Sequence, residues 1–451
     1  DGNLTGSNAA GAQTNGALAF PLNTDQPATV ALAAAGNLAK LRATVRRLRK
    51  RDFAAYQAAN EAFWNNWLAG AIVPDTDDQR ILAFAKRALI SIKTAQDRAS
   101  GNIVASVATQ PPYAYDWPRD SAFLNYVLDT AGFYDEVSRH NRTYLSYQRQ
   151  RPLPFGLAPA GTYEMNYDAA GQAGGPIFFE IDNTGLITWS LYDHYRQLNQ
   201  AGEPGAYAYL VEVYPAIALA ADGLADCRDE QTGLQCLANE DDNFSQTQTI
   251  HGAAAVYAAL WAAVAAGAAV GAPPQDIQRW QDRADQLRDA AFAHFWDDDA
   301  GHFTSAYKGE MWALFPAQLL PPDDPRAATH ADYLLDWALT ELSGEKGYLR
   351  YTALAFVSLG WYYRQIENTA ALADLRAIVS DFLHRIPTPD TLHLGEVAVL
   401  YDRDHDGRQE TVINEVCIPH VWNQSLNYLA AVLAYGGTPL PDPEPDDDDD
   451  D

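Results

Sequence analysis

Apolar residues recur with helical spacing along most of this 451-residue chain. Between residues 77 and 98 the apolar side chains fall at positions 81, 84, 85, 88, 89 and 92, the i, i+3, i+4 pattern of an amphipathic helix. Further helical patterns cover 118–131, 134–150, 183–200, 205–223, 246–266, 274–295, 310–319, 329–342, 348–366, 369–385 and 420–435. No strand-like alternation of comparable length competes, although short hairpins are expected within 155–180 and 300–307. The pattern predicts an all-α main body of twelve helices.

The regions outside this main body differ in composition. Residues 1–27 are rich in Gly, Asn, Ala and Thr and predict an extended N-terminal arm. Residues 28–72 read as linker helices, in which the basic segment LRATVRRLRKR is interpreted as a solvated helix face. Residues 73–438 form the predicted main body, and residues 439–451 an acidic Pro/Asp tail. The helices of the main body are joined by loops of unequal length, which favours a site on one rim.

The charge balance narrows the choice of partners. The chain has 31 basic and 59 acidic residues, a formal net charge of −28. Such a surface repels nucleic acids and anionic membranes and suits a neutral substrate. We expect no membrane-spanning segment, because no apolar run reaches the ~18 residues that a bilayer requires. The chain begins at Asp1 without a basic and apolar leader, so we expect either a processed or a trimmed chain. We expect the protein to be secreted.

The cysteines agree with that expectation. Cys227 and Cys236 flank a Thr-Gly turn, and we expect them to form a disulfide. The alternative is a pair of reduced cysteines in a cytosolic enzyme. Cys417 lies among apolar residues and reads as a buried thiol.

The stretch PPYAYDWPRDSA, residues 111–122, carries the first candidate chemistry. Its notable side chains are Tyr113, Tyr115, Trp117, Arg119 and Asp120. Pro118 suits the first turn of the following helix, so Arg119 and Asp120 are expected at the N-terminus of that helix. Aromatic rings cover sugar faces, and a charged pair can bind a hydroxyl group. The alternative, a capped helix with an ordinary surface ion pair, is disfavoured by three aromatics crowding one turn.

This stretch resembles the first signature of glycoside hydrolase family 15, the glucoamylase-like enzymes. The family pattern Y-x-Y-x-W-x-R-D-S is matched through to Ser121. The resemblance covers roughly residues 77–435. It implies an (α/α)6 barrel of twelve helices and an inverting hydrolase that releases glucose from the non-reducing ends of α-glucans.

A second signature implies the general acid. Hydrolysis of a glycosidic bond needs one carboxylic acid that protonates the leaving oxygen and a second carboxylate. The family has L-W-E-E before a helix, with Thr nine residues after the first Glu, and Glu240 and Thr249 keep this spacing. The resemblance therefore implies Glu240 as general acid and Asp241 as a substrate-binding neighbour. Asn239 stands where the family has Trp, and ordinary acidic enrichment before a helix is the alternative.

The catalytic base is expected between the last two helices, where Glu396, Glu410 and Glu415 are available. The resemblance favours Glu396, because Gly395 and Glu396 match the family's turn and Pro419 and Trp422 match its helix start. Val397 replaces the usual Gln. Glu415 is the fallback, and Trp422 is expected to bind substrate.

Two weaker substrate-binding candidates lie further upstream. Asp182 and Trp189 loosely match a family block in which a turn enters a helix. The alternative, a helix N-cap and a core indole, fits them equally well.

A calcium loop is expected after the proposed base. The sequence DRDHDG places Asp402, Asp404 and Asp406 at alternate positions, with Gly407 for the sharp turn. The twelfth position is Ile413, which excludes a full EF-hand. An acidic surface turn is the alternative.

Together these patterns predict a secreted, exo-acting glycoside hydrolase with no organic cofactor and a structural Ca²⁺ ion. The substrate could be starch chains, isomaltose-type or dextran-type linkages, or trehalose. The competing hypothesis is a catalytically degenerate barrel that binds sugars or self-assembles outside the cell through its polar termini, motivated by Asn239 and Val397.

Overall fold

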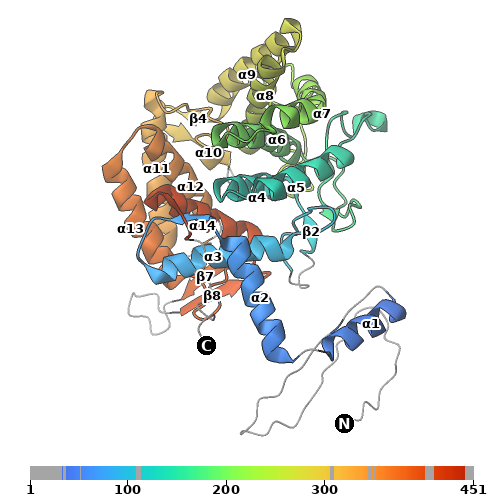
Figure 1. Cartoon of the computed structure of the whole chain (residues 1–451). Helices are drawn as coiled ribbons and strands as arrows, with labels where there is room; N and C mark the ends of the chain where they lie inside the picture. The colour runs from blue at the N-terminus through green and yellow to red at the C-terminus, as the bar shows by residue number, and fades with distance from the viewer. Residues whose placement is uncertain are drawn as a thin grey trace. The chain divides into compact units, whose positions relative to one another are not determined.

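The chain, described here from a computed structural model, divides into two units (Figure 1). One comprises residues 1–67 with 443–451, and the other residues 68–442. The structure describes residues 33, 37–50, 52–107, 113–304, 309–343, 348–349, 351–401 and 411–441. The predicted N-terminal arm, the acidic residues of the tail and the calcium candidates Asp402, Asp404 and Asp406 lie outside the described residues.

The first unit contains α1 (Leu38–Leu48) and most of α2 (Phe53–Leu68). The side chain of Asn37 caps α1 by accepting a hydrogen bond from the Lys40 N–H at 2.9 Å. Arg46 and Arg47 lie in the last turn of α1, where positive charge is favoured by the helix dipole. No residue of α1 is buried within the described chain. The basic segment therefore forms a solvated helix, as the sequence indicates.

The second unit is mainly helical. Its helices are α3 (Gln79–Ala95), α4 (Pro118–Thr130), α5 (Tyr134–Tyr147), α6 (Ile181–Ala201), α7 (Ala206–Asp226), α8 (Ile250–Val270), α9 (Pro274–Phe295), α10 (Gly309–Trp312), α11 (Pro325–Ser343), α12 (Thr352–Gln365), α13 (Thr369–Arg385) and α14 (Val421–Tyr435). Its short strands are β1 (Ile72–Pro74), β2 (Tyr115–Asp116), β3 (Tyr167–Asp168), β4 (Trp296–Asp297), β5 (His302–Phe303), β6 (Tyr348–Leu349), β7 (Val397–Tyr401), β8 (Thr411–Glu415) and β9 (Gly437–Pro439).

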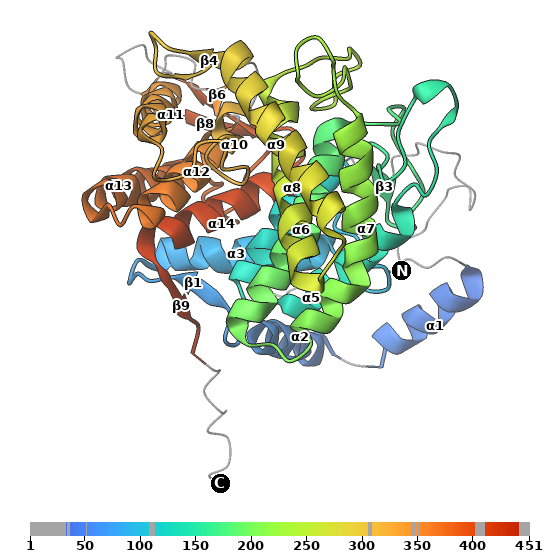
Figure 2. The same cartoon turned by 90° about the horizontal axis from the view of Figure 1, so that it is seen from above.

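Six of these helices contact one another in a closed cycle. The order is α4, α6, α8, α10, α12 and α14, and α14 returns to α4; we call these six the ring helices. The remaining helices pack against them, as α7 and α9 do beside α6 and α8 (Figure 2). The long ring helices are buried nearly all round, whereas an outer helix such as α9 buries one stripe (Trp280, Ala284, Leu287 and Ala291). Sequence periodicity reflects this difference, because only the outer helices need a polar face.

Two helices are more apolar than the sequence analysis expected. By length and composition alone, α7 and α8 could cross a membrane, which contradicts the expectation that no segment has this character. Within the structure, however, 67% of the apolar window of α8 is buried. Its small residues allow close packing, because a Cβ added at Gly185 of α6 would lie 2.5 Å from the Ala255 carbonyl oxygen. The apolar run is therefore used in helix-to-helix contact.

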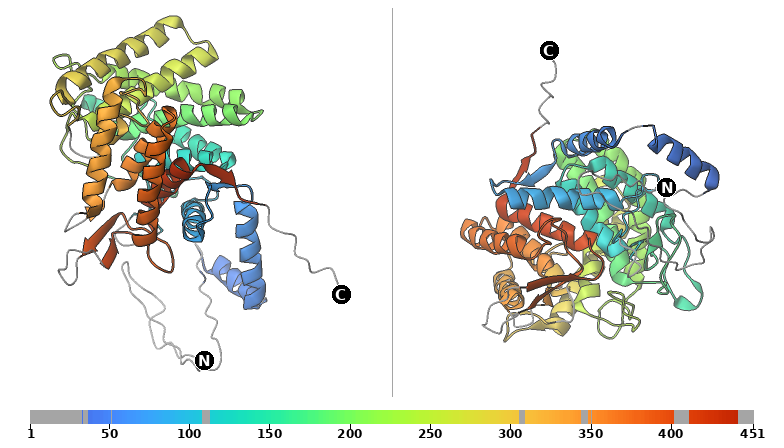
Figure 3. Two further views of the ribbon diagram at one scale, coloured as in Figure 1. Left: turned by 90° about the vertical axis from the view of Figure 1, so that its left-hand side faces the viewer. Right: turned by 90° about the horizontal axis from the view of Figure 1, so that it is seen from below.

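Two local predictions differ from the structure. The helix expected over 310–319 ends at Trp312, because Pro316 lacks the N–H that a continuing helix would need. A three-stranded sheet, β6–β7–β8, was not foreseen. In it β7 and β8 form an antiparallel pair that ends at Tyr401 opposite Thr411 (Figure 3). The predicted calcium residues fall between these two positions in the sequence.

The loop between α7 and α8 is closed by the expected disulfide. Cys227 and Cys236 are bonded, with their Cα atoms 4.9 Å apart, while Cys417 is a buried free thiol. Gln235, next to Cys236, donates hydrogen bonds to the carboxylate of Glu240 and to the carbonyl of Thr249. The disulfide thus anchors the base of a loop that carries candidate site residues.

Replacing Cys227 and Cys236 by Ser should lower the free energy of unfolding by about 2 to 3 kcal/mol, because a short cross-link restricts the unfolded chain. Urea unfolding of the variant and of the parent protein under non-reducing conditions measures this difference. Replacing the free Cys417 alone is the control for cysteine removal as such. An unchanged midpoint together with two free thiols in the parent protein would contradict the prediction.

Candidate active site

A pocket of about 610 Å³ collects side chains from loops that precede the ring helices. Its described lining residues are Tyr113, Trp117, Arg119, Asp120, Asp241, Asp242, Asn243, Glu310, Tyr333, Trp337, Tyr351, Glu396, His420 and Trp422. Most of them lie at or just before the N-terminus of a ring helix, where the helix dipole stabilises negative charge. The volume lies within the range of small-molecule sites. Among the described lining residues Arg119 is the only Lys or Arg, so the pocket is acidic.

Arg119 is the centre of the polar network. Its Nη1 lies 3.0 Å from Asp182 Oδ2, and its Nη2 lies 3.0 Å from Asp242 Oδ2. Its Nε lies 3.7 Å from Asp120 Oδ1 and 3.8 Å from Asp241 Oδ1. The guanidinium thereby ties the start of α4 to the start of α6 and to the loop before α8. The carboxylates keep it charged, since their attraction outweighs burial and raises its pKa.

Behind the pocket wall, two buried carboxyl groups have pKa values that are shifted in opposite directions. Burial would raise the pKa of Asp182, but His251, 2.8 Å away, and Arg119 outweigh it and lower that pKa to about 2. Glu180 has the opposite shift, because burial and the charges of Asp182 and Asp242 raise its pKa well above the ordinary value. Asp182 is therefore the more readily ionised of the two carboxyl groups.

Asp182 and Trp189 are not in the pocket wall. Asp182 is fully buried and does not cap α6, whose N-cap is Glu180, so the N-cap interpretation was wrong. It supports the site through Arg119 instead. Trp189 packs against Phe123, Tyr126 and Phe315 as a core indole, which agrees with the alternative reading.

Asp241 and Asp242 adopt left-handed backbone conformations, with φ of 51° and 60°. Non-glycine residues rarely do so unless the surroundings hold them there, and each costs on the order of 1 kcal/mol. Here Asp242 is held by Arg119, by the Trp117 Nε1–H at 3.2 Å, and by its own N–H, which donates to Glu180 Oε1 at 2.8 Å. This conformation directs both side chains to the pocket.

The structure places Glu240 outside the pocket, whereas a general acid is expected to line the pocket. Its side chain is 0% exposed, and its carboxylate accepts hydrogen bonds from the Thr249 hydroxyl (2.5 Å) and from Gln235 Nε2 (3.1 Å). A Cβ at Gly252 would collide with Glu240 Oε1, so α8 needs glycine there to make room. The spacing between Glu240 and Thr249 that the sequence showed corresponds to this buried contact. Glu240 therefore holds the loop before α8 in place on the side that faces away from the pocket.

Glu396 lies in the pocket wall on the turn before β7. The Tyr113 hydroxyl donates a hydrogen bond to Glu396 Oε2 at 2.7 Å. Burial and this contact raise the pKa of Tyr113, so Tyr113 remains a donor. The fallback Glu415 is exposed at the end of β8 and is not among the lining residues.

Aromatic rings form much of the pocket wall. Tyr113 and Trp117 lie 5.7 Å apart between ring centroids, and Trp422 lines the pocket at the start of α14. Tyr115 does not line the pocket; its ring meets Trp117 edge-on at 5.9 Å and supports it. Flat apolar faces beside carboxylates are suited to sugar rings.

Asp116 anchors the aromatic stretch from below and was not identified from the sequence as important. Its buried carboxylate accepts hydrogen bonds from the hydroxyl groups of Ser121 and Tyr144, from the Ile103 N–H at 3.0 Å, and contacts His140 Nε2 at 2.8 Å. The stretch from Tyr113 to Ser121 therefore contains a structural Asp among the residues that line the pocket. Pro118 stands at the first position of α4, as predicted.

Several lining residues were missed by the sequence analysis, namely Asp242, Asn243, Glu310, Tyr333, Trp337, Tyr351 and His420. Asp242 and His420 adjoin residues that were identified, and proximity to helix starts was an available signal. Glu310, Tyr333 and Trp337 carried none, because they sit in segments that read as ordinary helix. Among the described residues, no group of three or more His, Cys, Asp or Glu side chains could hold a metal ion.

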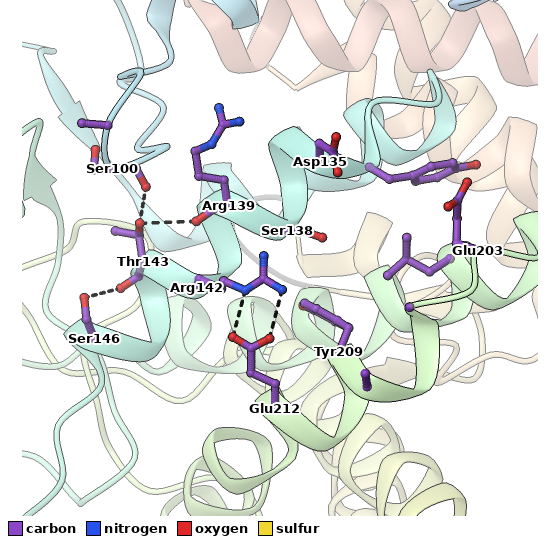
Figure 4. Close-up of a pocket in the computed structure, with 15 residues that line it drawn as sticks. Ser100, Asp135, Ser138, Arg139, Arg142, Thr143, Ser146, Glu203, Tyr209 and Glu212 are labelled. Atoms are coloured by element: carbon purple, nitrogen blue, oxygen red, sulfur yellow. Dashed lines mark hydrogen bonds and ion pairs between the residues drawn. The ribbon is translucent and has the colours of Figure 1, made fainter.

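A second hollow, of about 730 Å³, lies between α5 and the start of α7. Its main charged contact is internal, because Arg142 and Glu212 form a two-point ion pair at 2.8 and 3.0 Å (Figure 4). Of its lining carboxylates, Glu212 is already paired with Arg142, and Asp135 and Glu203 have tyrosine but no tryptophan rings beside them among the described lining residues. The smaller acidic pocket is therefore the candidate active site.

Comparison with solved structures finds proteins of similar fold. The chain is similar to a glycosidase variant in complex with glucose (TM-score 0.55, 19% identity, covering 80% of this chain and 99% of that one). It is also similar to a rhamnosidase from Klebsiella oxytoca with rhamnose bound (TM-score 0.53, 15% identity, 81% and 66% covered). A third is a GH63 mannosylglycerate hydrolase from Thermus thermophilus in complex with glucose (TM-score 0.53, 13% identity, 77% and 99% covered).

No known family profile matches the chain, and no curated protein sequence matches it. At these identities the likeness concerns the fold. The protein is mostly helical and matches glycosidase folds of the (α/α)6 type.

Replacing Asp116 by Asn should destabilise the protein by about 3 kcal/mol, because the amide NH₂ group would face buried donors. Urea unfolding at pH 7 measures the loss. Asp374→Asn is the matched control, since Asp374 is exposed on α13 and should change stability by less than about 0.5 kcal/mol. Equal stability of the two variants would show that Asp116 is not an anchor.

Proposed function

We propose that this protein is an exo-acting, inverting glycoside hydrolase that releases glucose from the non-reducing ends of α-glucans or α-glucosides. The observation that carries the proposal is the presence of Asp241 and Glu396 in one aromatic pocket. Asp241 precedes α8, and the turn that carries Glu396 is hydrogen-bonded to the start of α14, because the His420 N–H and Asn423 Nδ2 donate to the carbonyls of Leu394 and Gly395 at 2.8 Å. α8 and α14 stand opposite each other in the cycle of ring helices. Two carboxyl groups on either side of the scissile bond are what this hydrolysis requires. The fold likeness to glycosidases supports the same reaction class.

In the proposed reaction Glu396 is the general base. It takes a proton from a water molecule as the water oxygen attacks the anomeric carbon, and the bond to the leaving oxygen breaks. The Tyr113 hydroxyl orients Glu396 through the 2.7 Å hydrogen bond. The other pocket carboxylates favour the positive charge that develops on the sugar in the transition state.

We assign the general acid to Asp241 in place of Glu240, because Glu240 has no access to the pocket. Asp241 would carry a proton in the substrate complex and give it to the leaving oxygen, while Asp182 and Asp242 remain the ionised partners of Arg119. Asp242 is less suited, since Arg119 and Trp117 already occupy its two oxygens. Glu240 then acts as a positioning residue that holds the loop through Thr249 and Gln235.

Arg119 and Asp120 are proposed to bind hydroxyl groups of the terminal glucose at the N-terminus of α4. The sugar would lie between the faces of Trp117 and Trp422. A relationship to the glucoamylase-like family is part of the proposal, supported by Trp117, Arg119 and Asp120 of its first signature lining the pocket. We also propose that the enzyme is secreted, since its disulfide suits an oxidising compartment. A structural Ca²⁺ at Asp402, Asp404 and Asp406 stays a prediction.

Replacing Glu396 by Gln should lower kcat about a thousandfold with little change in KM, because the amide cannot accept the proton. Glucose release from maltose, isomaltose, trehalose and soluble starch identifies the substrate and provides the assay. Glu415→Gln is the control and should leave activity unchanged. For an inverting enzyme, NMR should show β-glucose as the first product from an α-glucoside; α-glucose would contradict the mechanism.

Replacing Asp241 by Asn should abolish turnover of maltose yet spare much of the activity on 4-nitrophenyl α-glucoside. The nitrophenolate leaves without a proton, so an acid is needed only for the natural leaving group. Glu240→Gln is the comparison and should affect both substrates equally, through loop position. The reverse pattern would return the general acid to Glu240.

The competing function is a sugar-binding barrel without catalysis, favoured by the departures at Asn239 and Val397. It predicts that the parent protein binds glucose or maltose in a fluorescence titration and releases no glucose from any substrate in the panel. Glucose release that Glu396→Gln abolishes excludes it.

A further inference from the structure

Glu310 is a pocket residue that the proposed acid and base do not use. It lines the candidate active site at the start of α10, yet its side chain is only 5% exposed. Its Oε2 is buried and has no hydrogen-bond partner among the described protein groups. An unpaired carboxyl oxygen at a pocket wall is costly unless a ligand group meets it.

The surroundings of Glu310 offer no positive charge among the described residues. His330 of α11 contacts the backbone oxygen of Glu310 at 2.6 Å, and burial lowers the pKa of this imidazole to about 4, so it is neutral. Tyr333 of the same helix is also uncharged, because burial and Glu310 raise its pKa. The other titratable groups on the packed elements and across the pocket are His251, His420, Tyr113, Tyr351, Asp120, Asp241, Asp242, Glu396 and Arg119, and Arg119 is itself paired with Asp182 and Asp242.

This setting keeps the proton on Glu310. Burial raises the pKa of the carboxyl to about 8, with only its own backbone N–H acting in the opposite direction. At neutral pH the group is a carboxylic acid that can donate one hydrogen bond and accept another. It is therefore a neutral polar group in a pocket where Asp120, Asp241 and Asp242 surround Arg119.

The position of Glu310 in the cycle of ring helices indicates what it would contact. α10 stands opposite α4, which carries Arg119 and Asp120. A sugar ring gripped by those residues presents its other hydroxyl groups towards α10. Tyr333 and Trp337 line the same side of the pocket and would flank that edge of the sugar.

We infer that Glu310 is a specificity-determining residue that donates a hydrogen bond, as a neutral carboxylic acid, to a sugar hydroxyl on the side of the pocket opposite Arg119. This assignment rests on the proposed function. A site built to pair a hydroxyl discriminates strongly against sugars that lack it, since the buried group is then left unpaired.

Two substitutions separate hydrogen bonding from packing, each made in the inactive Glu396→Gln background. Glu310→Gln keeps a neutral donor and acceptor, whereas Glu310→Met keeps the volume and removes both. In a tryptophan-fluorescence titration with glucose at pH 7, the Gln variant should bind within about twofold of the parent and the Met variant about tenfold more weakly. Unfolding midpoints show whether either variant is misfolded.

The pH profile distinguishes a hydrogen-bond donor from a merely structural residue. In the background variant, glucose affinity should fall as the pH rises through about 8, because ionised Glu310 cannot donate. With Glu310→Gln the affinity should stay flat across that step. The binding of several deoxyglucoses identifies the hydroxyl group that Glu310 contacts. If the Met substitution does not weaken the binding of one deoxyglucose, the hydroxyl group that this sugar lacks is the partner of Glu310.

The outcomes separate this inference from the proposed function. If Glu396→Gln binds no glucose at any pH, the proposed function fails and the Glu310 assignment fails with it. If glucose binds but Glu310→Gln is as weak as Glu310→Met, or if the parent affinity shows no step near pH 8, only the Glu310 assignment is overturned.

Discussion

The architecture of the pocket depends on one buried guanidinium. Arg119 contacts Asp182 at the start of α6 and Asp242 before α8, and it stands itself at the start of α4. Burying a cation is costly unless its partners are well placed, so these segments cannot shift independently. The left-handed backbone of Asp241 and Asp242 is the local cost of that arrangement. It turns two carboxyl groups towards the pocket and leaves Glu240 behind the wall.

One cation among so many acids also decides which of them are ionised. Asp182, next to both Arg119 and His251, loses its proton easily, whereas burial and the neighbouring charges of Asp182 and Asp242 raise the pKa of Glu180. Glu310 is distant in the cycle from Arg119, and burial raises the pKa of its carboxyl to about 8, so it holds a proton at neutral pH. Carboxyl groups thus act as anions near α4 and as a neutral hydrogen-bond donor near α10. A substrate with many hydroxyl groups and no charge fits such a mixture.

The helical framework makes this convergence achievable. Small residues let the ring helices approach closely, as at Gly185 against Ala255, and their N-termini bring partial positive charge towards the acidic pocket. Beneath the aromatic wall, Asp116 ties the loop before α4 to α5 through Tyr144 and His140. The disulfide at Cys227 and Cys236 performs a similar task for the loop before α8. Rigid support of this kind is what positions side chains on loops for chemistry.

The local sequence determined where the helices lie, because helical periodicity and the position of Pro118 at the first residue of α4 can be read within a few residues. It also determined one group of pocket residues, because Tyr113, Trp117, Arg119 and Asp120 are close together in the sequence. It also indicated Glu396, which follows a recognisable turn. Only the tertiary structure decided that Asp241 faces the pocket while Glu240 is buried, since the left-handed backbone of Asp241 and Asp242 changes the direction of the neighbouring side chains. It likewise brought Glu310, Tyr333 and Trp337 to the site from segments that read as plain helix. Which face of a helix meets a pocket depends on packing against distant elements, and no local pattern records it.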